Sequence, residues 1–156
     1  MPPRTNLKVL VLDTDFYARQ AINSYLAWDR RTRVVHLADT LESVREYVRA
    51  VDESEWPDVV LLDAQAASTP AELARLVSEI EQTIPHVMTL VLDRKLNLET
   101  LHACEQAQVN GYLLRDELRI RIASAIIASA LAVISALGIR TLTAQGVWDC
   151  PTTIGT

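Results

Sequence analysis

Five short apolar runs alternate along the chain with segments of helical periodicity, and this alternation restricts the possible folds more than any other feature. The runs predict strands at residues 7–12, 33–38, 58–62, 86–92 and 111–114. Apolar residues at helical spacing predict helices at 16–28, from 41, from 70, at 98–107 and from about 117. Strands that are apolar throughout are typical of a parallel sheet buried on both faces. We therefore predict a doubly wound, five-stranded parallel α/β sheet covered by helices.

Four of the five predicted strands end in a charged residue, namely Asp13, Asp63, Asp93 and Arg115. In open parallel sheets, ligands bind at the carboxyl ends of the strands. We therefore expect these four side chains to share one pocket. Asp15 also follows the first strand, but its place just before a helix predicts a helix cap.

Three segments resemble the receiver domain of two-component response regulators. They are VLVLDTD from Val9, PDVVLLDA from Pro57 and GYLLRDE from Gly111. The last segment is similar to the GYLLKDE of the subfamily whose receivers precede LuxR-type DNA-binding domains. The resemblance covers about residues 7–136. It implies a flavodoxin-like fold with strand order 2-1-3-4-5, a receiver-like domain over residues 1–138, and a tail or linker over 139–156.

The resemblance also implies a chemistry for the charged strand ends. Asp63 matches the aspartate that accepts a phosphoryl group from a histidine kinase. Asp13 and Asp63 match ligands of Mg²⁺, which neutralises the phosphoryl charge. Tyr112 matches an aromatic switch residue that turns inward when a hydroxyl on the fourth strand bonds the phosphate, although an aromatic packed at a sheet edge is an alternative interpretation.

Three positions depart from the family pattern. Thr14 replaces a second metal-binding acid, Asp93 replaces a threonine or serine, and Arg115 replaces a lysine. An ionised carboxylate at position 93 repels a phosphoryl group, so we expect phosphorylation at Asp63 to be weak or absent and Mg²⁺ to bind weakly at best. Three interpretations stay open: a pocket in which Arg115 bridges Asp63 and Asp93, a pocket that has simply degenerated, and surviving phosphorylation.

Two alternative functions follow from the same residues. The first alternative is a conventional phosphorylatable regulator that controls transcription through an output domain outside this sequence. The second is a phosphatase of the haloacid dehalogenase type, in which Asp13 and Asp15 act as nucleophile and general acid. Tyr17 stands where that family has threonine or valine, and no clear acid pair follows Asp93. We therefore expect no enzyme.

Composition and charge bear on partners and location. The net charge is −5 and basic residues are scattered, so we expect no nucleic-acid binding by this domain. Cys104 and Cys150 match no metal-ligand spacing and form no disulfide framework, which favours a reducing, cytoplasmic location. A histidine kinase is the possible partner that the resemblance implies.

The predicted last helix contains a segment without charge, residues 122–139. One half of this helix carries only small residues, which are Ser124, Ala125, Ala128, Ser129, Ala132, Ser135 and Ala136. A helix face without charge typically marks an interface. We therefore predict a homodimer, or a contact with a partner protein, through residues 122–138. Insertion into a membrane is the alternative that the length of the segment just permits, and we expect none.

Overall fold

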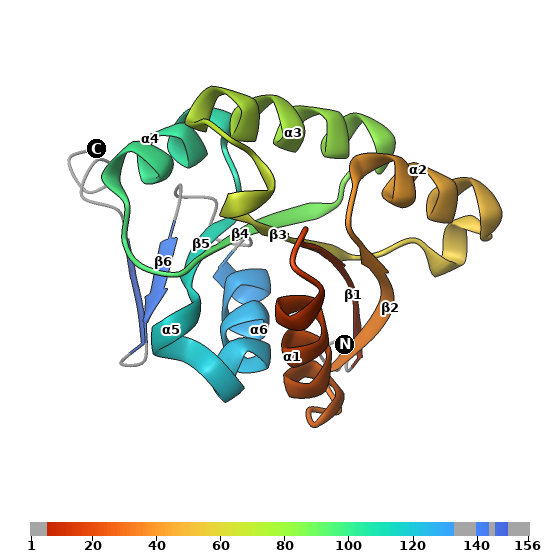
Figure 1. Cartoon of the computed structure of the whole chain (residues 1–156). Coiled ribbons are helices and arrows are strands. Elements are labelled where there is room, and N and C mark those ends of the chain that lie inside the picture. The colour runs from red at the N-terminus through yellow and green to blue at the C-terminus, as the bar shows by residue number, and fades with distance from the viewer. Residues whose placement is uncertain (1–5, 133–139, 144–145, 150–156) are drawn as a thin grey trace.

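The computed structural model describes residues 6–132, 140–143 and 146–149 and contains one mixed sheet (Figure 1). Five parallel strands in the order β2-β1-β3-β4-β5 confirm the predicted topology. These strands are β1 (Leu7–Leu12), β2 (Thr32–Ala38), β3 (Val59–Asp63), β4 (Met88–Asp93) and β5 (Gly111–Leu114). The helices are α1 (Phe16–Ala27), α2 (Leu41–Ala50), α3 (Pro70–Thr83), α4 (Leu98–Ala107), α5 (Arg115–Leu118) and α6 (Ile122–Ala132).

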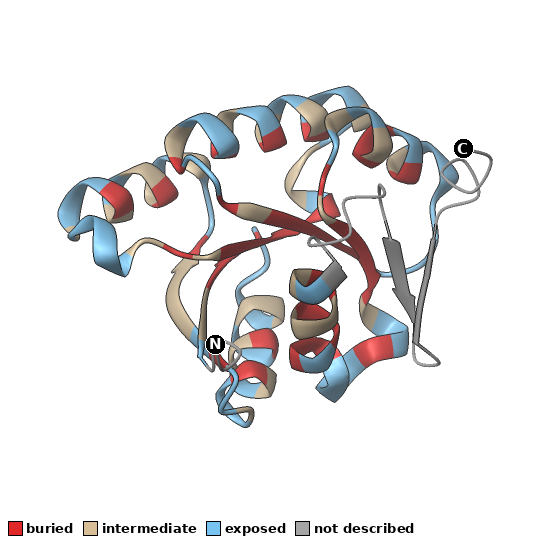
Figure 2. Cartoon of the chain, turned by 180° about the vertical axis from the view of Figure 1, so that it is seen from behind, coloured by how far each residue is buried: buried red, intermediate tan, exposed pale blue. Residues whose placement is uncertain are grey.

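The helices form two layers, one on each face of the sheet. Helices α2, α3 and α4 cover one face, and α1 and α6 lie side by side on the other (Figure 1). Alternate residues of each strand point to opposite faces, so Leu10 and Leu12 join the first core while Val9 and Val11 join the second. Strands β1, β3, β4 and β5 are mostly buried, whereas the edge strand β2 is mostly half-buried, as Figure 2 shows. Two apolar cores on a buried sheet stabilise this arrangement, at roughly 1.5–3 kcal/mol for each large apolar side chain removed from water.

Side-chain caps fix the starts of several helices, among them α1 and α3. Asp15 Oδ1 accepts hydrogen bonds from the backbone N–H of Tyr17 (2.9 Å) and Ala18 (3.2 Å), which confirms that Asp15 caps α1. Thr69 Oγ1 accepts from the N–H of Glu72 at 3.1 Å and caps α3. Both caps satisfy backbone donors that the first helical turn leaves free.

The predicted last helix is not continuous, and this is a correction. The chain forms the short α5, then a single 3-10 turn at Arg119–Arg121, and only then α6. The break lies at Arg119, whose φ of 46° and ψ of −118° are incompatible with a helix. No glycine or proline marks this position, so the apolar periodicity contained no sign of the break.

The small residues of α6 do not form one outward face, which corrects a second expectation. Ser124 is exposed and Ala128 is half-buried. Ala125 and Ser129 are buried, at 5% and 1% exposed, whereas Leu131 is 59% exposed. Small side chains allow a helix to approach its neighbours closely, and here α6 uses them against the core that it shares with α1. Residues 133–139, where the prediction placed the rest of the face, lie outside the described residues.

The sheet continues past the five predicted strands. β6 (Arg140–Thr143) pairs parallel to β5, and β7 (Gly146–Asp149) pairs antiparallel to β6. These strands lie in the segment predicted as a tail or linker. Among the described residues, no helix has both the length and the apolar character needed to cross a membrane.

Candidate functional site

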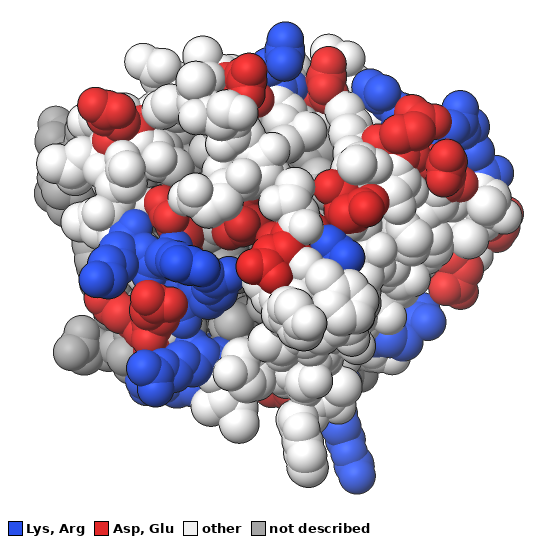
Figure 3. Space-filling view, in the orientation of Figure 1, with Lys and Arg blue, Asp and Glu red and all other residues white. Residues whose placement is uncertain are grey.

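Three carboxylates lie buried at the carboxyl ends of the central strands. Asp13, Asp63 and Asp93 are 1%, 6% and 5% exposed and follow or end β1, β3 and β4. Asp13 and Asp93 both act electrostatically on Asp63, so the structure brings the three predicted acids together. Basic side chains gather beside acidic ones on the left of this face of the molecule (Figure 3).

Two oxygens of this cluster have no hydrogen-bond partner. Asp13 Oδ1 accepts from the backbone N–H of Asp15 at 2.9 Å, but Asp13 Oδ2 and Asp63 Oδ1 are buried and unpaired. Burial, followed by the charge of Asp13, raises the pKa of Asp63 to about 7. A buried carboxylate pair of this kind needs a proton or a cation between its oxygens.

The residues present fit a Mg²⁺ ion only in part. Mg²⁺ prefers oxygen ligands and usually takes one or two carboxylates together with water or phosphate oxygens. Asp13 and Asp63 would supply the two carboxylates. Thr14 supplies none, and the Asp15 carboxylate is engaged as the cap of α1. Within the described residues, no group of three histidine, cysteine or acidic side chains is arranged to hold a metal.

Asp93 is hydrogen-bonded to the buried ring of Tyr112. The Tyr112 hydroxyl donates to Asp93 Oδ2 at 2.5 Å, and the ring is 0% exposed. Asp93 Oδ1 accepts from the N–H of Arg94 at 2.8 Å, so both oxygens of this carboxylate are used. Burial, with the Asp93 carboxylate next, raises the pKa of Tyr112 far above its ordinary value. Tyr112 therefore points inward, toward the end of β4.

The same hydroxyl connects the strand end to α4. The backbone N–H of Asn97 donates to Tyr112 Oη at 3.2 Å. Asn97 Oδ1 in turn accepts from the N–H of Thr100 at 3.1 Å and caps α4. An unbroken series of hydrogen bonds therefore runs from Asp93 to the first turn of α4.

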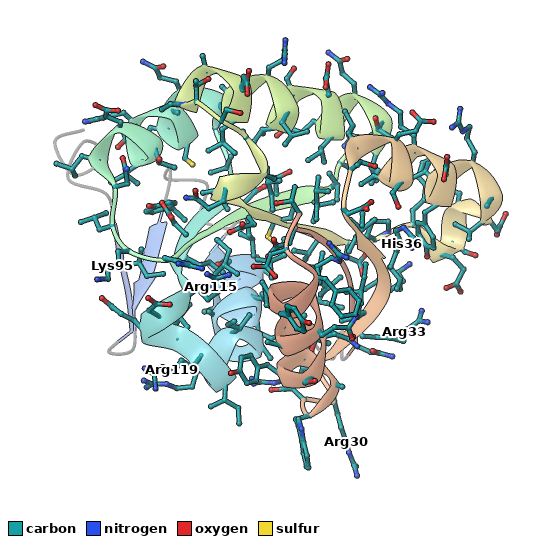
Figure 4. All side chains as sticks on the ribbon, viewed as in Figure 1. Arg30, Arg33, His36, Lys95, Arg115 and Arg119 are labelled. Atoms are coloured by element: carbon teal, nitrogen blue, oxygen red, sulfur yellow. The ribbon has the colours of Figure 1, made fainter. Side chains whose placement is uncertain are left out.

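Arg115 does not bridge the carboxylates, which argues against the first of the three interpretations that the sequence left open. The structure contains no ion pair between Arg115 and either Asp63 or Asp93 among its described residues. Arg115 acts on Asp63 only through space, lowering its pKa against the larger effect of burial. It is the first residue of α5, and its side chain lines a pocket beside α1 (Figure 4).

Sequence reasoning missed three residues of this region. Arg94 and Arg119 line the same pocket as Arg115, and Asn97 holds Tyr112. The position of Arg94 directly after a strand end was a usable signal, as was the four-residue spacing of Arg115 and Arg119. The contact of Asn97 with Tyr112 had no signal, because it depends on the path of a loop.

No protein-family model and no curated protein sequence matches the chain. Solved structures do match it. The signal receiver domain of the response regulator NarL from Mycobacterium tuberculosis is 22% identical, with a TM-score of 0.66 over 81% of this chain and 97% of that one. The isolated receiver domain of RcsB from Salmonella enterica serovar Typhimurium is 17% identical, with a TM-score of 0.68 over 81% and 90%. A LuxR-family DNA-binding response regulator from Silicibacter pomeroyi is 16% identical, with a TM-score of 0.64 over 81% and 93%. The chain therefore has the fold of a response-regulator receiver domain.

Proposed function

We propose that this chain is an atypical receiver domain that acts in signal transduction through protein contacts, with phosphorylation at Asp63 weak or absent. The observation that carries the proposal is the hydrogen bond from Tyr112 to Asp93. The role we assign is binding in the cytoplasm and not catalytic turnover.

Charge at the site argues against a phosphorylated state. A phosphoryl group on Asp63 carries about −1.5 to −2 of charge near neutral pH, in place of the single charge of the free carboxylate. That charge would be placed among Asp13 and Asp93, which are both buried. Within the described residues of this site, Asp13 and Asp63 remain to hold a neutralising cation, since Thr14 has no carboxylate. Like charges at short range in a buried site disfavour the phosphorylated form.

The state of Tyr112 supports signalling that does not depend on phosphorylation. Its hydroxyl already has an acceptor in Asp93 and a donor in the Asn97 N–H. Because Asn97 caps α4, this network sets the loop between β4 and α4 as well as the start of that helix. A partner that recognises the β4–α4 loop and the start of α4 would therefore bind a surface with a single conformation.

The test is incubation with acetyl phosphate and Mg²⁺, followed by intact-mass measurement. We expect little mass increase for the parent protein. The double variant Thr14→Asp with Asp93→Thr restores a second acid and a hydroxyl, so we expect it to gain one phosphoryl group. Adding Asp63→Asn to that double variant should remove the gain and serves as the matched control.

A stoichiometric mass increase in the parent that disappears in Asp63→Asn would reject the proposal. It would favour the conventional alternative, in which the chain is a phosphorylatable regulator of transcription that works through an output domain outside this sequence. A histidine kinase would then be its partner.

For the protein contact itself, we propose a homodimer or a partner protein bound through α6. Leu131 on α6 and Ile120 just before this helix are 59% and 64% exposed. These two side chains lie at opposite ends of α6, and each offers an apolar contact along this helix. The proposed contact therefore uses these residues in place of the small side chains that the core has taken up.

A further inference from the structure

An open pocket of about 500 Å³ lies between α1 and the start of α5, next to the acidic cluster. Its volume lies within the range of small-molecule sites, roughly 300–1,000 Å³. Three arginines line it: Arg94 from the loop after β4, Arg115 from the start of α5, and Arg119 from the break after α5. In Figure 4, Arg115 and Arg119 lie on the same side of the molecule, toward α5, with Lys95 nearby.

These guanidinium groups make no salt bridge in the described part of the chain, although Arg115 acts on Asp63 through space. Arg119 Nε donates to the backbone carbonyl of Asp116 at 3.2 Å. Two acids also line the pocket, Asp15 and Asp116, but Asp15 is engaged as the cap of α1. The three guanidinium groups share one cavity and repel one another, and an anion bound between them would offset that repulsion.

The opposite wall of the pocket is mostly apolar. It consists of one side of α1, including Ala18, Ala21 and the half-buried Tyr25. Small residues here leave space, and an aromatic ring offers a surface for a flat or apolar group. The pocket therefore has a cationic side and an apolar side.

The backbone at Arg119 is strained, and the strain places this residue at the pocket. Its φ of 46° lies in a region that residues with a Cβ atom rarely occupy. Strained residues of this kind cluster at ligand sites, where the surrounding structure holds them in place. This observation is independent of the charge of the cavity.

We propose that this pocket binds a small molecule that carries a phosphate or carboxylate group on a planar or apolar body. The three arginines would hold the anionic group, since guanidinium groups donate paired hydrogen bonds to both kinds of oxyanion. The body would lie against α1. Asp63 does not line the pocket, although Arg115 acts on it through space. The proposal therefore goes beyond the proposed signalling function and does not require phosphorylation to be absent.

The test is isothermal titration calorimetry of the full chain with three probes: adenosine 5′-monophosphate, inorganic phosphate and adenosine. We expect the monophosphate to bind most tightly, phosphate more weakly, and adenosine weakest of all. The variant Arg115→Gln with Arg119→Gln should lower the affinity for the monophosphate by at least about tenfold. Arg30→Gln removes a charge on a side chain that points away from the pocket and should leave affinity within about twofold.

A second pair of variants tests the apolar wall. Ala21→Glu places a carboxylate inside the pocket and should reduce the affinity at least about tenfold, whereas Ala27→Glu, also exposed on α1 but outside the pocket, should not. Absence of saturable binding of the monophosphate in the millimolar range overturns the proposal, as does equal binding of adenosine. Unchanged affinity in the double arginine variant overturns it too. Asp63→Asn should still bind the monophosphate, so failure of the phosphorylation proposal and failure of this one give different results.

Discussion

When a buried tyrosine hydroxyl that donates to a buried carboxylate is removed, the carboxylate loses a hydrogen-bond donor and the folded state is destabilised. We predict that Tyr112→Phe destabilises the protein by about 1–3 kcal/mol at neutral pH, because Asp93 Oδ2 then loses its donor. Urea unfolding measures the loss. Asp93→Asn, which keeps an acceptor oxygen for Tyr112, should cost less than Tyr112→Phe. Equal stability of Tyr112→Phe and the parent would show that the hydrogen bond contributes nothing.

Asp63 should make stability depend on pH in an unusual direction. Its folded pKa is raised to about 7 by burial and by Asp13, well above the value of about 3.9 in an unfolded chain. The folded state therefore binds the proton more tightly, so the stabilisation is present below the unfolded pKa and lost as pH rises toward 7. We predict that Asp63→Asn is more stable than the parent by roughly 1–3 kcal/mol at about pH 8 and close to it at about pH 4.

Chemical unfolding at several pH values tests this, with the exposed Glu117→Gln as the control that should show no such trend. A constant difference between Asp63→Asn and the parent across the pH range would contradict it.

For individual residues, the sequence predicted which side chains lie in one cluster, but not the hydrogen bonds and ion pairs that they form. Asp13, Asp63 and Asp93 could be placed together because parallel strands end at one edge of a sheet. The direction of the Arg115 side chain could not be predicted, since a long flexible side chain at a helix start has many rotamers. The bond between Tyr112 and Asp93 depends on the register of β4 against β5, which no local pattern specifies.

Among the elements, the break between α5 and α6 is the one that local sequence disfavours. Arg119 adopts a positive φ, which costs a residue with a Cβ atom more free energy than it costs glycine. We predict that Arg119→Gly stabilises the protein by roughly 1 kcal/mol, while Arg119→Ala, which keeps Cβ, does not. Thermal unfolding of the two variants beside the parent measures this. Equal effects of glycine and alanine would show that backbone strain is not the cause.

The five parallel strands and the first four helices could be predicted because each has a buried apolar stripe of sufficient length. β6 and β7 have four residues each and alternate polar with apolar positions only briefly, so they carry too weak a pattern. The orientation of α6 was wrong for a different reason. Its residues are apolar or small all around, so periodicity could not distinguish the buried side from the outer side.

For the whole molecule, we predict a homodimer through α6. Leu131→Glu introduces charge at an exposed position and should yield a folded monomer, whereas Leu98→Glu, equally exposed at the start of α4, should remain dimeric. Light scattering at tens of micromolar distinguishes the two, with circular dichroism as the check on folding. A parent protein that is already monomeric under these conditions would exclude the homodimer and leave the partner protein.

The inward position of Tyr112 has a consequence for the equilibrium between conformers. A hydrogen bond to a charged group contributes about 1.5–3 kcal/mol, so an outward conformer that gives it up is populated at roughly one part in ten to one in a hundred or fewer. The apparent dissociation constant of a partner is its intrinsic value divided by the fraction of molecules in the competent form. For a partner that selects the inward form this fraction is close to one, so its affinity is nearly the full intrinsic affinity at all times. A partner that selects the outward form binds weaker by the same factor of ten to a hundred, whatever the quality of its own contacts.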